Sequence, residues 1–355
     1  MKISYHQPAL STVTANRTIY EGFKFAFEDS GHIFSTYTAG VDLEKFLQEN
    51  NPDIFITASH FFHRKQLDFY ILKKYRDKGM KIFVKIDFWN SPLLAGRVNE
   101  AKSMKDDAEV LDLIKKNMFG DIYFHVVEQG DKRMGGFEEV TGHKFKTLPL
   151  AADKRLMQNI KFEEKFAADI SFIGTNLPQK REVFKTWLFP LAKMYNLKLY
   201  GQDWTTFDKG LGWVQKVGQY FNIPIIKSIR KPKLKLEDEA TIYKSSKVCV
   251  NLHEDYQKES GGDCNERAFK IPAYGGFQIS DNVACLRKYF KDGEEIIIAK
   301  DKNDWYEKVE YYINNPEERA KIARAGYDRV LRDHTYHNRV GEIIKWYEEI
   351  KNENK

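Results

Sequence analysis

Two cationic side chains, Arg267 and Lys270, lie three positions apart in residues 261–282, whose sequence is GGDCNERAFKIPAYGGFQISDN. This sequence predicts a glycine-rich loop, a short helix, a turn at Gly275 and a strand. Cations three apart share one face of a helix, and beside the free N–H groups of a helix N-terminus they attract an anion such as phosphate. A surface helix whose charges face water would carry the same pair. The neighbouring segments are therefore needed to distinguish a phosphate site from a solvated helix.

Polar and glycine residues follow the predicted strands on either side of this stretch. The candidates for a phosphate site are Gly174, Thr175, Lys180, Arg181, Asn251 and His253. The first two would offer backbone N–H groups, the next two would add charge at the start of a helix, and the last two share one face of a strand end. Asp263 or Asn265 would cap the helix that carries Arg267.

The segment VCVNLH at 248–253, the glycine-rich loop, Arg267-x-Phe269 and Gly275-Gly276-Phe277 followed by Asp281 resemble the C-terminal half of CgeB-like glycosyltransferases. The resemblance extends over about 169–339 and is weak over the first 150 residues. It implies a GT-B fold with two Rossmann-like domains facing a cleft. It also implies a nucleotide-sugar donor and a C-terminal helix that returns to the first domain.

One residue departs from this family. Many relatives carry Glu at the position of Lys270, and in related retaining transferases that Glu holds the donor ribose. Here the nearest carboxylate is Glu266, one helical turn earlier. In the interpretation we favour, Glu266 takes over the ribose while Lys270 joins Arg267 at the diphosphate. In the alternative, Glu266 and Lys270 merely form an exposed ion pair.

A catalytic base is needed if the transfer inverts the sugar configuration, and it commonly comes from the N-terminal domain. Strand ends there offer His6, His60, His63 and Asp87, of which His6 is our first choice and Asp87 the second. A retaining transferase needs no such base, and the sequence leaves the choice open. Arg267 would neutralise the departing diphosphate. No Asp-x-Asp motif is present, so we expect no metal and no cofactor beyond the nucleotide-sugar co-substrate.

Length and composition fit a two-domain soluble protein. The chain has 355 residues, of which 42% are hydrophobic and 30% charged, and no run of 18 apolar residues occurs. The N-terminus lacks the apolar core of a signal peptide. Three cysteines are too few for a disulfide framework. We therefore expect a cytoplasmic protein, with the inner membrane face as a peripheral site.

The formal net charge is +6, and the densest basic run is KSIRKPKLK at 227–235. The proline predicts an exposed loop there. The loop is either a solvated segment, a contact with a membrane or an acceptor, or a nucleic-acid contact. We expect no nucleic-acid partner.

The apolar runs alternate between strand and helix patterns, which is typical of parallel α/β domains. Expected strands are 3–5, 33–37, 53–58, 81–86, 122–127, 146–148, 169–173, 197–200, 248–252, 277–280 and 295–298. Expected helices are 17–29, 42–49, 66–78, 108–116, 181–195, 238–245, 303–313, 316–332 and 335–351. A linker at 149–153 would separate an acceptor-side domain, 1–150 with the helix 336–355, from a nucleotide-sugar-binding domain, 165–335.

These observations favour a glycosyltransferase with a donor site formed by Gly174, Thr175, Arg181, Asn251, His253, Glu266, Arg267 and Lys270. Gln202 and Trp204, after another strand, are further candidates, with Trp204 either stacking on the base or packing in the core. The acceptor would be a surface glycan, a lipid-linked glycan or a protein. A nucleotide-sugar epimerase of the same architecture and a non-catalytic nucleotide-sugar or nucleic-acid binder are the alternatives.

Overall fold

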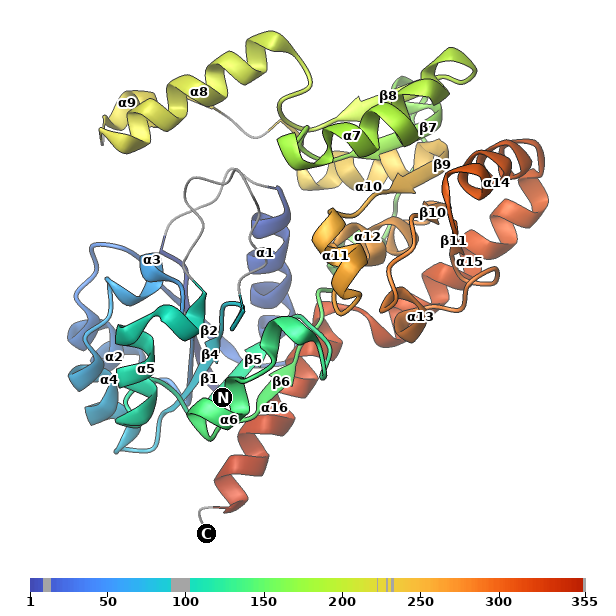
Figure 1. Cartoon of the computed structure of the whole chain (residues 1–355). Helices are drawn as coiled ribbons and strands as arrows, with labels where there is room; N and C mark the ends of the chain where they lie inside the picture. The colour runs from blue at the N-terminus through green and yellow to red at the C-terminus, as the bar shows by residue number, and fades with distance from the viewer. Residues whose placement is uncertain (9–13, 91–102, 222, 228, 231–232, 354–355) are drawn as a thin grey trace.

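The computed structural model describes residues 1–8, 14–90, 103–221, 223–227, 229–230 and 233–353, and contains two separate parallel sheets (Figure 1). The first has the strand order β2-β1-β3-β4-β5-β6 and the second β11-β10-β9-β7-β8. The first-sheet strands are β1 (Lys2–His6), β2 (Ile33–Tyr37), β3 (Ile54–Ala58), β4 (Lys81–Lys85), β5 (Ile122–His125) and β6 (Phe145–Thr147). The second-sheet strands are β7 (Ala168–Ile173), β8 (Leu197–Tyr200), β9 (Ser246–Asn251), β10 (Gln278–Ser280) and β11 (Ile297–Ile298).

Both faces of the first sheet are covered, because its central strands are apolar on both sides. Phe55, Ile82 and Val84 pack against one helical layer, and Ile54 and Phe83 pack against the other. The first layer contains α2 (Leu43–Asn50), α4 (Phe69–Arg76) and α5 (Ala108–Lys115), and the second contains α1 (Thr14–Asp29) and α16 (Tyr336–Glu353). Two short helices, α3 (Phe61–Arg64) and α6 (Phe137–Thr141), complete this half.

The C-terminal helix α16 returns to the first sheet, as the family resemblance implies. It buries Tyr336, Val340, Ile343 and Trp346 in the same core as Phe23 of α1. Figure 1 shows α16 leaving the second half of the molecule and running along the first. The chain thus crosses between the two halves twice, once after β6 and once at α16.

The second sheet lies between two helical layers. The helices of this half are α7 (Arg181–Val183), α8 (Thr206–Tyr220), α9 (Pro224–Lys227), α10 (Leu236–Ser245), α11 (Asp255–Ser260), α12 (Arg267–Ala273), α13 (Leu286–Tyr289), α14 (Lys302–Asn314) and α15 (Pro316–Asp333). Residues of α10, α12 and α13 form one core with Cys249 of β9. On the other face, Trp305 of α14 and Phe184 pack with Phe172 and Val250 of the strands.

The structure differs from the sequence prediction in two places in this half. The single helix expected over 181–195 is broken into α7, a π-helical turn at Phe184–Leu188 and a 3-10 turn at Phe189–Lys193. Pro190 explains the break, because it has no N–H to donate and its ring clashes with the preceding turn. The helices α8, α9, α11 and α13 were not predicted. Three glycines make α8 a poor helix by propensity alone.

The basic run 227–235 is only partly a solvated loop. Lys227 ends α9, and residues 228, 231 and 232 lie outside the described residues. Arg230 donates to Asp203 at 2.6 Å and to Asp208 at 3.0 Å, and Lys233 lies 3.4 Å from Asp208. These two cations therefore fold the run back onto the start of α8.

Candidate nucleotide-sugar site

Arg267 is held at the carboxyl ends of β7 and β9. Its guanidinium donates to the carbonyl oxygens of Ile173 at 3.2 Å and Leu252 at 2.9 Å, and its Nε donates to Asn251 Oδ1 at 3.2 Å. The group lies over the ring of Phe172, 4.9 Å from its centroid. Three hydrogen bonds and a stacked ring fix the orientation of the guanidinium before any ligand arrives.

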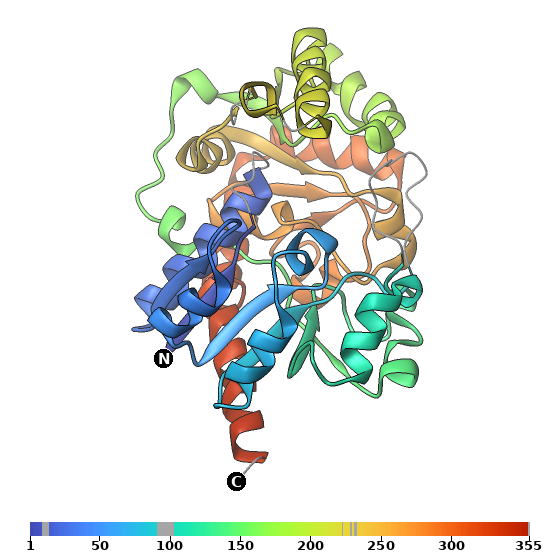
Figure 2. The ribbon, with the colours of Figure 1, turned by 90° about the vertical axis from the view of Figure 1, so that its left-hand side faces the viewer.

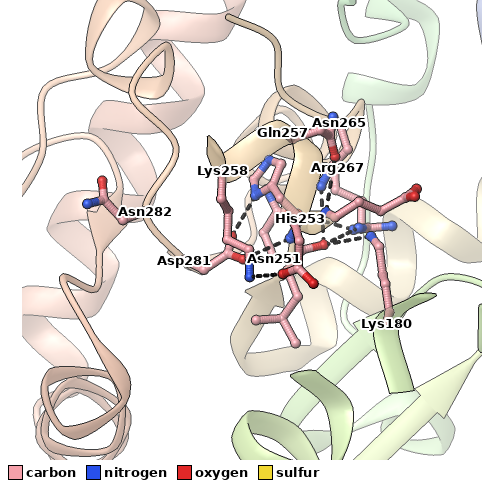
Figure 3. Close-up of polar contacts among 12 residues, drawn as sticks. Lys180, Asn251, His253, Gln257, Lys258, Asn265, Arg267, Asp281 and Asn282 are labelled. Atoms are coloured by element: carbon pink, nitrogen blue, oxygen red, sulfur yellow. Dashed lines mark hydrogen bonds and ion pairs between the residues drawn. The ribbon is translucent and has the colours of Figure 1, made fainter. Parts of the chain in front are cut away.

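Lys180 points to the same place, and Figure 3 shows it beside Arg267. Its Nζ donates to the Leu252 carbonyl at 2.9 Å, and the side chain is buried. Burial and the neighbouring Arg267 charge lower the pKa of Lys180 to about 7. Among the described residues, neither Lys180 nor Arg267 has a carboxylate within ion-pair distance. Two cationic groups that converge on one carbonyl without a direct ion pair make a site for an anion.

The predicted charge at this helix start falls on Lys180, and Arg181 is exposed. Lys180 ends a 3-10 turn (Pro178–Lys180) directly before α7, and adjacent residues of a helical segment point in directions about 100° apart. The sequence prediction places Arg181 in the donor site, with Lys180 as a further source of charge. Arg181 is not part of the cluster around Leu252.

Gly174 lies close to Arg267, but its role differs from the predicted one. Its N–H donates to the carbonyl of Tyr200 at 2.9 Å inside the sheet, so it is not available to a phosphate. A Cβ at Gly174 would come within 3.0 Å of an Arg267 nitrogen, so the glycine makes room for the guanidinium. Thr175 follows it in the loop and accepts from Leu177 N–H through its carbonyl.

His253 is buried at the end of β9 and is fixed by Asp281 from the end of β10. Its Nδ1 lies 2.6 Å from Asp281 Oδ1, and its backbone N–H donates to Asp281 Oδ2 at 2.9 Å. Burial lowers the pKa of His253 even though Asp281 opposes the shift. The neutral ring therefore donates from Nδ1 to the carboxylate, which leaves a lone pair on Nε2.

Several buried polar atoms around this cluster have no hydrogen-bond partner among the described residues. They are Asn176 Oδ1, Gln179 Oε1, Asn251 Nδ2, His253 Nε2 and Asn265 Oδ1. Buried polar groups are nearly always paired in folded proteins, so a cluster of unpaired ones beside two cationic groups indicates a place where a polar ligand binds. Three of the five belong to the strand end 251–253 and to the loop before α12.

Lys270 and Glu266 lie on α12 but turn away from the guanidinium of Arg267. Lys270 Nζ lies 2.5 Å from Glu239 and 3.4 Å from Glu266, and it also contacts Thr18 of α1. Glu266 accepts from the hydroxyl of Tyr336 at 3.1 Å. The structure supports neither sequence interpretation: the pair is not exposed, and its members face the first domain and α16.

Burial and the neighbouring charges set the protonation states of Glu266 and Lys270. It raises the pKa of Glu266 to about 7, against the opposing effect of Lys270. Burial also opposes the charge of Lys270, but Glu239 and Glu266 outweigh it and raise its pKa. The arrangement is therefore a charged Lys270 paired with Glu239, beside a Glu266 that is half protonated near neutral pH.

The candidates for a catalytic base in the first domain differ in burial. His6 is buried, contacts Thr57 at 3.0 Å and Gln66 at 3.3 Å through its two ring nitrogens, and packs on Tyr37. Burial lowers its pKa to about 4, so His6 is a core residue and a poor base. Asp87 is half-buried at the end of β4 and accepts from the Ser59 hydroxyl at 2.8 Å. His63 packs on His6, and burial lowers its pKa to about 3.

Trp204 serves the core of the second domain. Its Nε1 donates to the Gly174 carbonyl at 2.8 Å, and its ring packs against Phe172, Phe184 and Phe189. Its indole therefore supports the loop that carries Gly174, which is the packing alternative of the sequence prediction. Gln202 is half-buried, and its carbonyl accepts from Asn176 N–H.

The loop after β5 touches the glycine-rich loop of the second domain directly. Glu128 N–H donates to the Gly262 carbonyl at 2.8 Å, and a Cβ at Gly262 would overlap a carboxylate oxygen of Asp131. Arg133 joins Asp131 to Asp263 in a buried ion triad. Gly262 thus admits the other domain rather than a ligand, and Asp263 does not cap α12, which has Glu266 at its N-cap.

Two negative findings concern the described residues. No three His, Cys, Asp or Glu side chains among them gather closely enough to hold a metal ion. The same part of the chain includes no helix that could span a bilayer.

Two parallel sheets, a polar site at the strand ends of the second and a returning C-terminal helix define the GT-B fold. Solved structures share it. A sucrose-phosphate synthase from Thermosynechococcus elongatus superimposes with a TM-score of 0.61 over 99% of both chains at 11% identity. A glycosyltransferase from Rickettsia africae gives 0.62 over 98% of both at 12%. An alpha-glucosyltransferase in complex with UDP-glucose and DNA gives 0.60 over 97% of this chain and 98% of that one at 12%.

Residues 181–345 match the glycosyl transferase-like family. The curated spore protein CgeB of Bacillus subtilis is 24% identical over 197 residues, which cover 53% of this chain and 57% of CgeB. The match therefore spans little more than half the length of that relative. The predicted CgeB-like resemblance is confirmed, and the match to the glycosyl transferase-like family covers the second half of the chain.

Proposed function

We propose that the protein transfers a sugar from a nucleoside-diphosphate sugar to an acceptor hydroxyl. The observation that supports this most is the convergence of Lys180 and Arg267 on the Leu252 carbonyl. A nucleoside diphosphate leaves with two negative phosphates, and preorganised cations stabilise that charge as it develops. Such groups make a metal ion unnecessary at the phosphates, and no cofactor other than the co-substrate is required.

In this proposal each side chain has a separate role. Arg267 binds the diphosphate through its planar fork and is the catalytic group that stabilises the leaving group. Lys180 adds the second charge, and Asn251 orients Arg267. His253, held by Asp281, accepts a hydrogen bond at Nε2 from a hydroxyl of the donor.

The choice of a catalytic base on the acceptor side is based on the positions of residues at strand ends and not on contacts with a ligand. Asp87 remains a candidate base for an inverting reaction, because His6 has both ring nitrogens engaged inside the domain. A retaining reaction needs neither. We propose a surface glycan, a lipid-linked glycan or a protein as the acceptor, and work in the cytoplasm at the inner face of the membrane.

The reaction class can be tested with nucleoside-diphosphate sugars in which the sugar is isotope-labelled. A transferase releases nucleoside diphosphate in proportion to the acceptor glycosylated, with only slow hydrolysis when acceptor is omitted. An epimerase would change the sugar with no acceptor and no release of diphosphate, which would contradict the proposal. A binding protein would do neither, and a nucleic-acid binder would show affinity that falls steeply with salt.

A further inference from the structure

The helix α8 has its apolar face turned outward. Phe207 is 75% exposed and Trp213 is 68% exposed, and Ile225 of the neighbouring α9 is 84% exposed. The side of α8 that is buried carries Asp208, Gly212, Gln215 and Gly218, which are polar or very small. Globular proteins normally bury the apolar face of such a helix, so this inverted pattern marks an interaction surface.

The helices α8 and α9 together form an arm of the molecule. Ion pairs and small residues hold the inner side of this arm. Arg230 bridges Asp203 and Asp208, and a Cβ at Gly212 would come within 2.8 Å of an Arg230 nitrogen. The helices α8 and α9 pack on each other. Figures 1 and 2 show them together at the top of the molecule, and in Figure 1 they extend from the side of the second sheet over the first half of the molecule. The outward direction of Phe207 and Trp213 is therefore fixed by polar contacts on the opposite side.

The same segment carries the excess positive charge of the protein. Residues 205–235 contain seven Lys or Arg and one Asp, while the whole chain contains 57 Lys or Arg and 51 Asp or Glu. The segment alone thus accounts for the net charge of +6, and the rest of the chain is balanced. Lys209 and Lys216 of α8 are exposed on the same side of the helix, next to Trp213.

We propose that this arm, formed by α8 and α9, docks on an anionic lipid bilayer with the apolar face of α8 in the headgroup region. Exposed Phe and Trp bordered by lysines are what an interfacial helix presents to anionic lipid. Exposed Ile225 and Ile229 fit acyl chains but offer nothing to a nucleic-acid base. A second copy of this chain would bring an equally positive arm and is disfavoured by charge.

The proposed membrane contact is the exposed face of α8 together with α9, and not the basic run 227–235 alone. Arg230 and Lys233 of that run are engaged with Asp208, so binding comes from the exposed lysines and the apolar side chains of α8. Docking would hold the second domain at the bilayer, where a membrane-held acceptor could reach the donor site. Only this last step rests on the proposed transferase function.

The test is co-sedimentation of the full chain with vesicles of phosphatidylcholine, with and without roughly one-third phosphatidylglycerol. We expect binding to the anionic vesicles that weakens with salt. The double variant Phe207→Ser/Trp213→Ser should bind at least about tenfold more weakly, because two apolar side chains no longer enter the bilayer. Lys209→Glu and Lys216→Glu should each cost about fivefold. Tyr70→Ser on α4 and Lys321→Glu on α15 change equally exposed side chains elsewhere and should bind as wild type.

Wild-type protein that ignores anionic vesicles, or a Phe207→Ser/Trp213→Ser variant that binds them equally well, would overturn the proposal. So would a dimer that these substitutions dissociate, or single-stranded nucleic acid that binds the arm more tightly than lipid does. Nucleoside-diphosphate affinity measured on the same samples separates this proposal from the proposed function. The arm variants should retain that affinity, and its absence in all samples would count against the transferase and not against the lipid contact.

Discussion

Lys180 and Arg267 donate to the same acceptor, the carbonyl oxygen of Leu252, at 2.9 Å each. They come from segments almost ninety positions apart, and no carboxylate among the described residues forms an ion pair with either. The Leu252 carbonyl and the more distant carboxylates Glu254 and Asp281 stabilise the two like charges. A diphosphate would relieve their repulsion, which is why we assign the donor site to this pair.

Nucleotide binding should depend on pH through Lys180. Its pKa is lowered to about 7, so the amine of the free protein is largely neutral at higher pH. A bound diphosphate favours the ammonium form, so binding takes up a proton and Kd should rise by about tenfold per pH unit above 7. Calorimetry in two buffers of different ionisation enthalpy measures this uptake. In Lys180→Arg the dependence should flatten, whereas a wild-type Kd that is constant from neutral to alkaline pH would argue against the assignment.

Lys270 should matter for stability rather than for the donor. Lys270→Met leaves Glu239 buried without its partner, which should cost about 3–5 kcal/mol in the free energy of unfolding. Adding Glu239→Gln should recover much of that loss, and urea unfolding of the two variants measures both. If Lys270→Met were as stable as wild type but bound nucleotide poorly, Lys270 would belong to the donor site after all.

Gly262 should control the contact between the two domains. A methyl group there would overlap Asp131, so Gly262→Ala should lower the free energy of unfolding by about 1–3 kcal/mol and favour a more open arrangement. Thermal unfolding and small-angle scattering measure the two effects. Gly210→Ala in α8 meets open space and should not lower the stability, so it serves as the control. An unchanged scattering profile with unchanged stability would mean that the domains do not approach this closely in solution.

Stability should fall in mild acid because His6 is buried in the neutral state. Its pKa is about 4 when folded, against 6.5 for a histidine exposed to water, so the unfolded chain binds an extra proton between these values. The stability that His6 contributes is present above pH 6.5 and is lost as the pH falls toward 4. Between pH 7 and 5, wild type should lose about 2 kcal/mol more than His6→Gln in urea unfolding. Equal losses would show that His6 is not buried as described.

Much of this fold could be predicted because buried parallel strands are continuous apolar runs, as in IFITA of β3. The helix α8 was missed because Gly210, Gly212 and Gly218 oppose helix formation, and its stability comes from contacts with α9 and Arg230 that no local pattern reveals.

The site was harder to predict than the fold. The sequence predicts Arg267, Asn251 and His253 as neighbours because they belong to a strand end and a helix start, and the structure does place them together. The structure buries Lys180 and exposes Arg181, and composition does not reveal which of two adjacent residues at a helix start points inward. The partner of Lys270 is Glu239, which is 31 positions away on another helix. Only the tertiary structure brings these two together.

The central claim is that Lys180 and Arg267 bind a diphosphate, and nucleotide affinity tests it most directly. UDP, ADP and GDP should be titrated beside the matching monophosphates and nucleosides into wild type, Lys180→Ala, Arg267→Ala and the exposed control Arg181→Ala. We predict that wild type and Arg181→Ala prefer one diphosphate over its nucleoside by about 10²-fold or more, and that each site variant loses most of this preference. A wild type that binds none of the diphosphates, or an Arg267→Ala variant that keeps the full preference, would contradict the account.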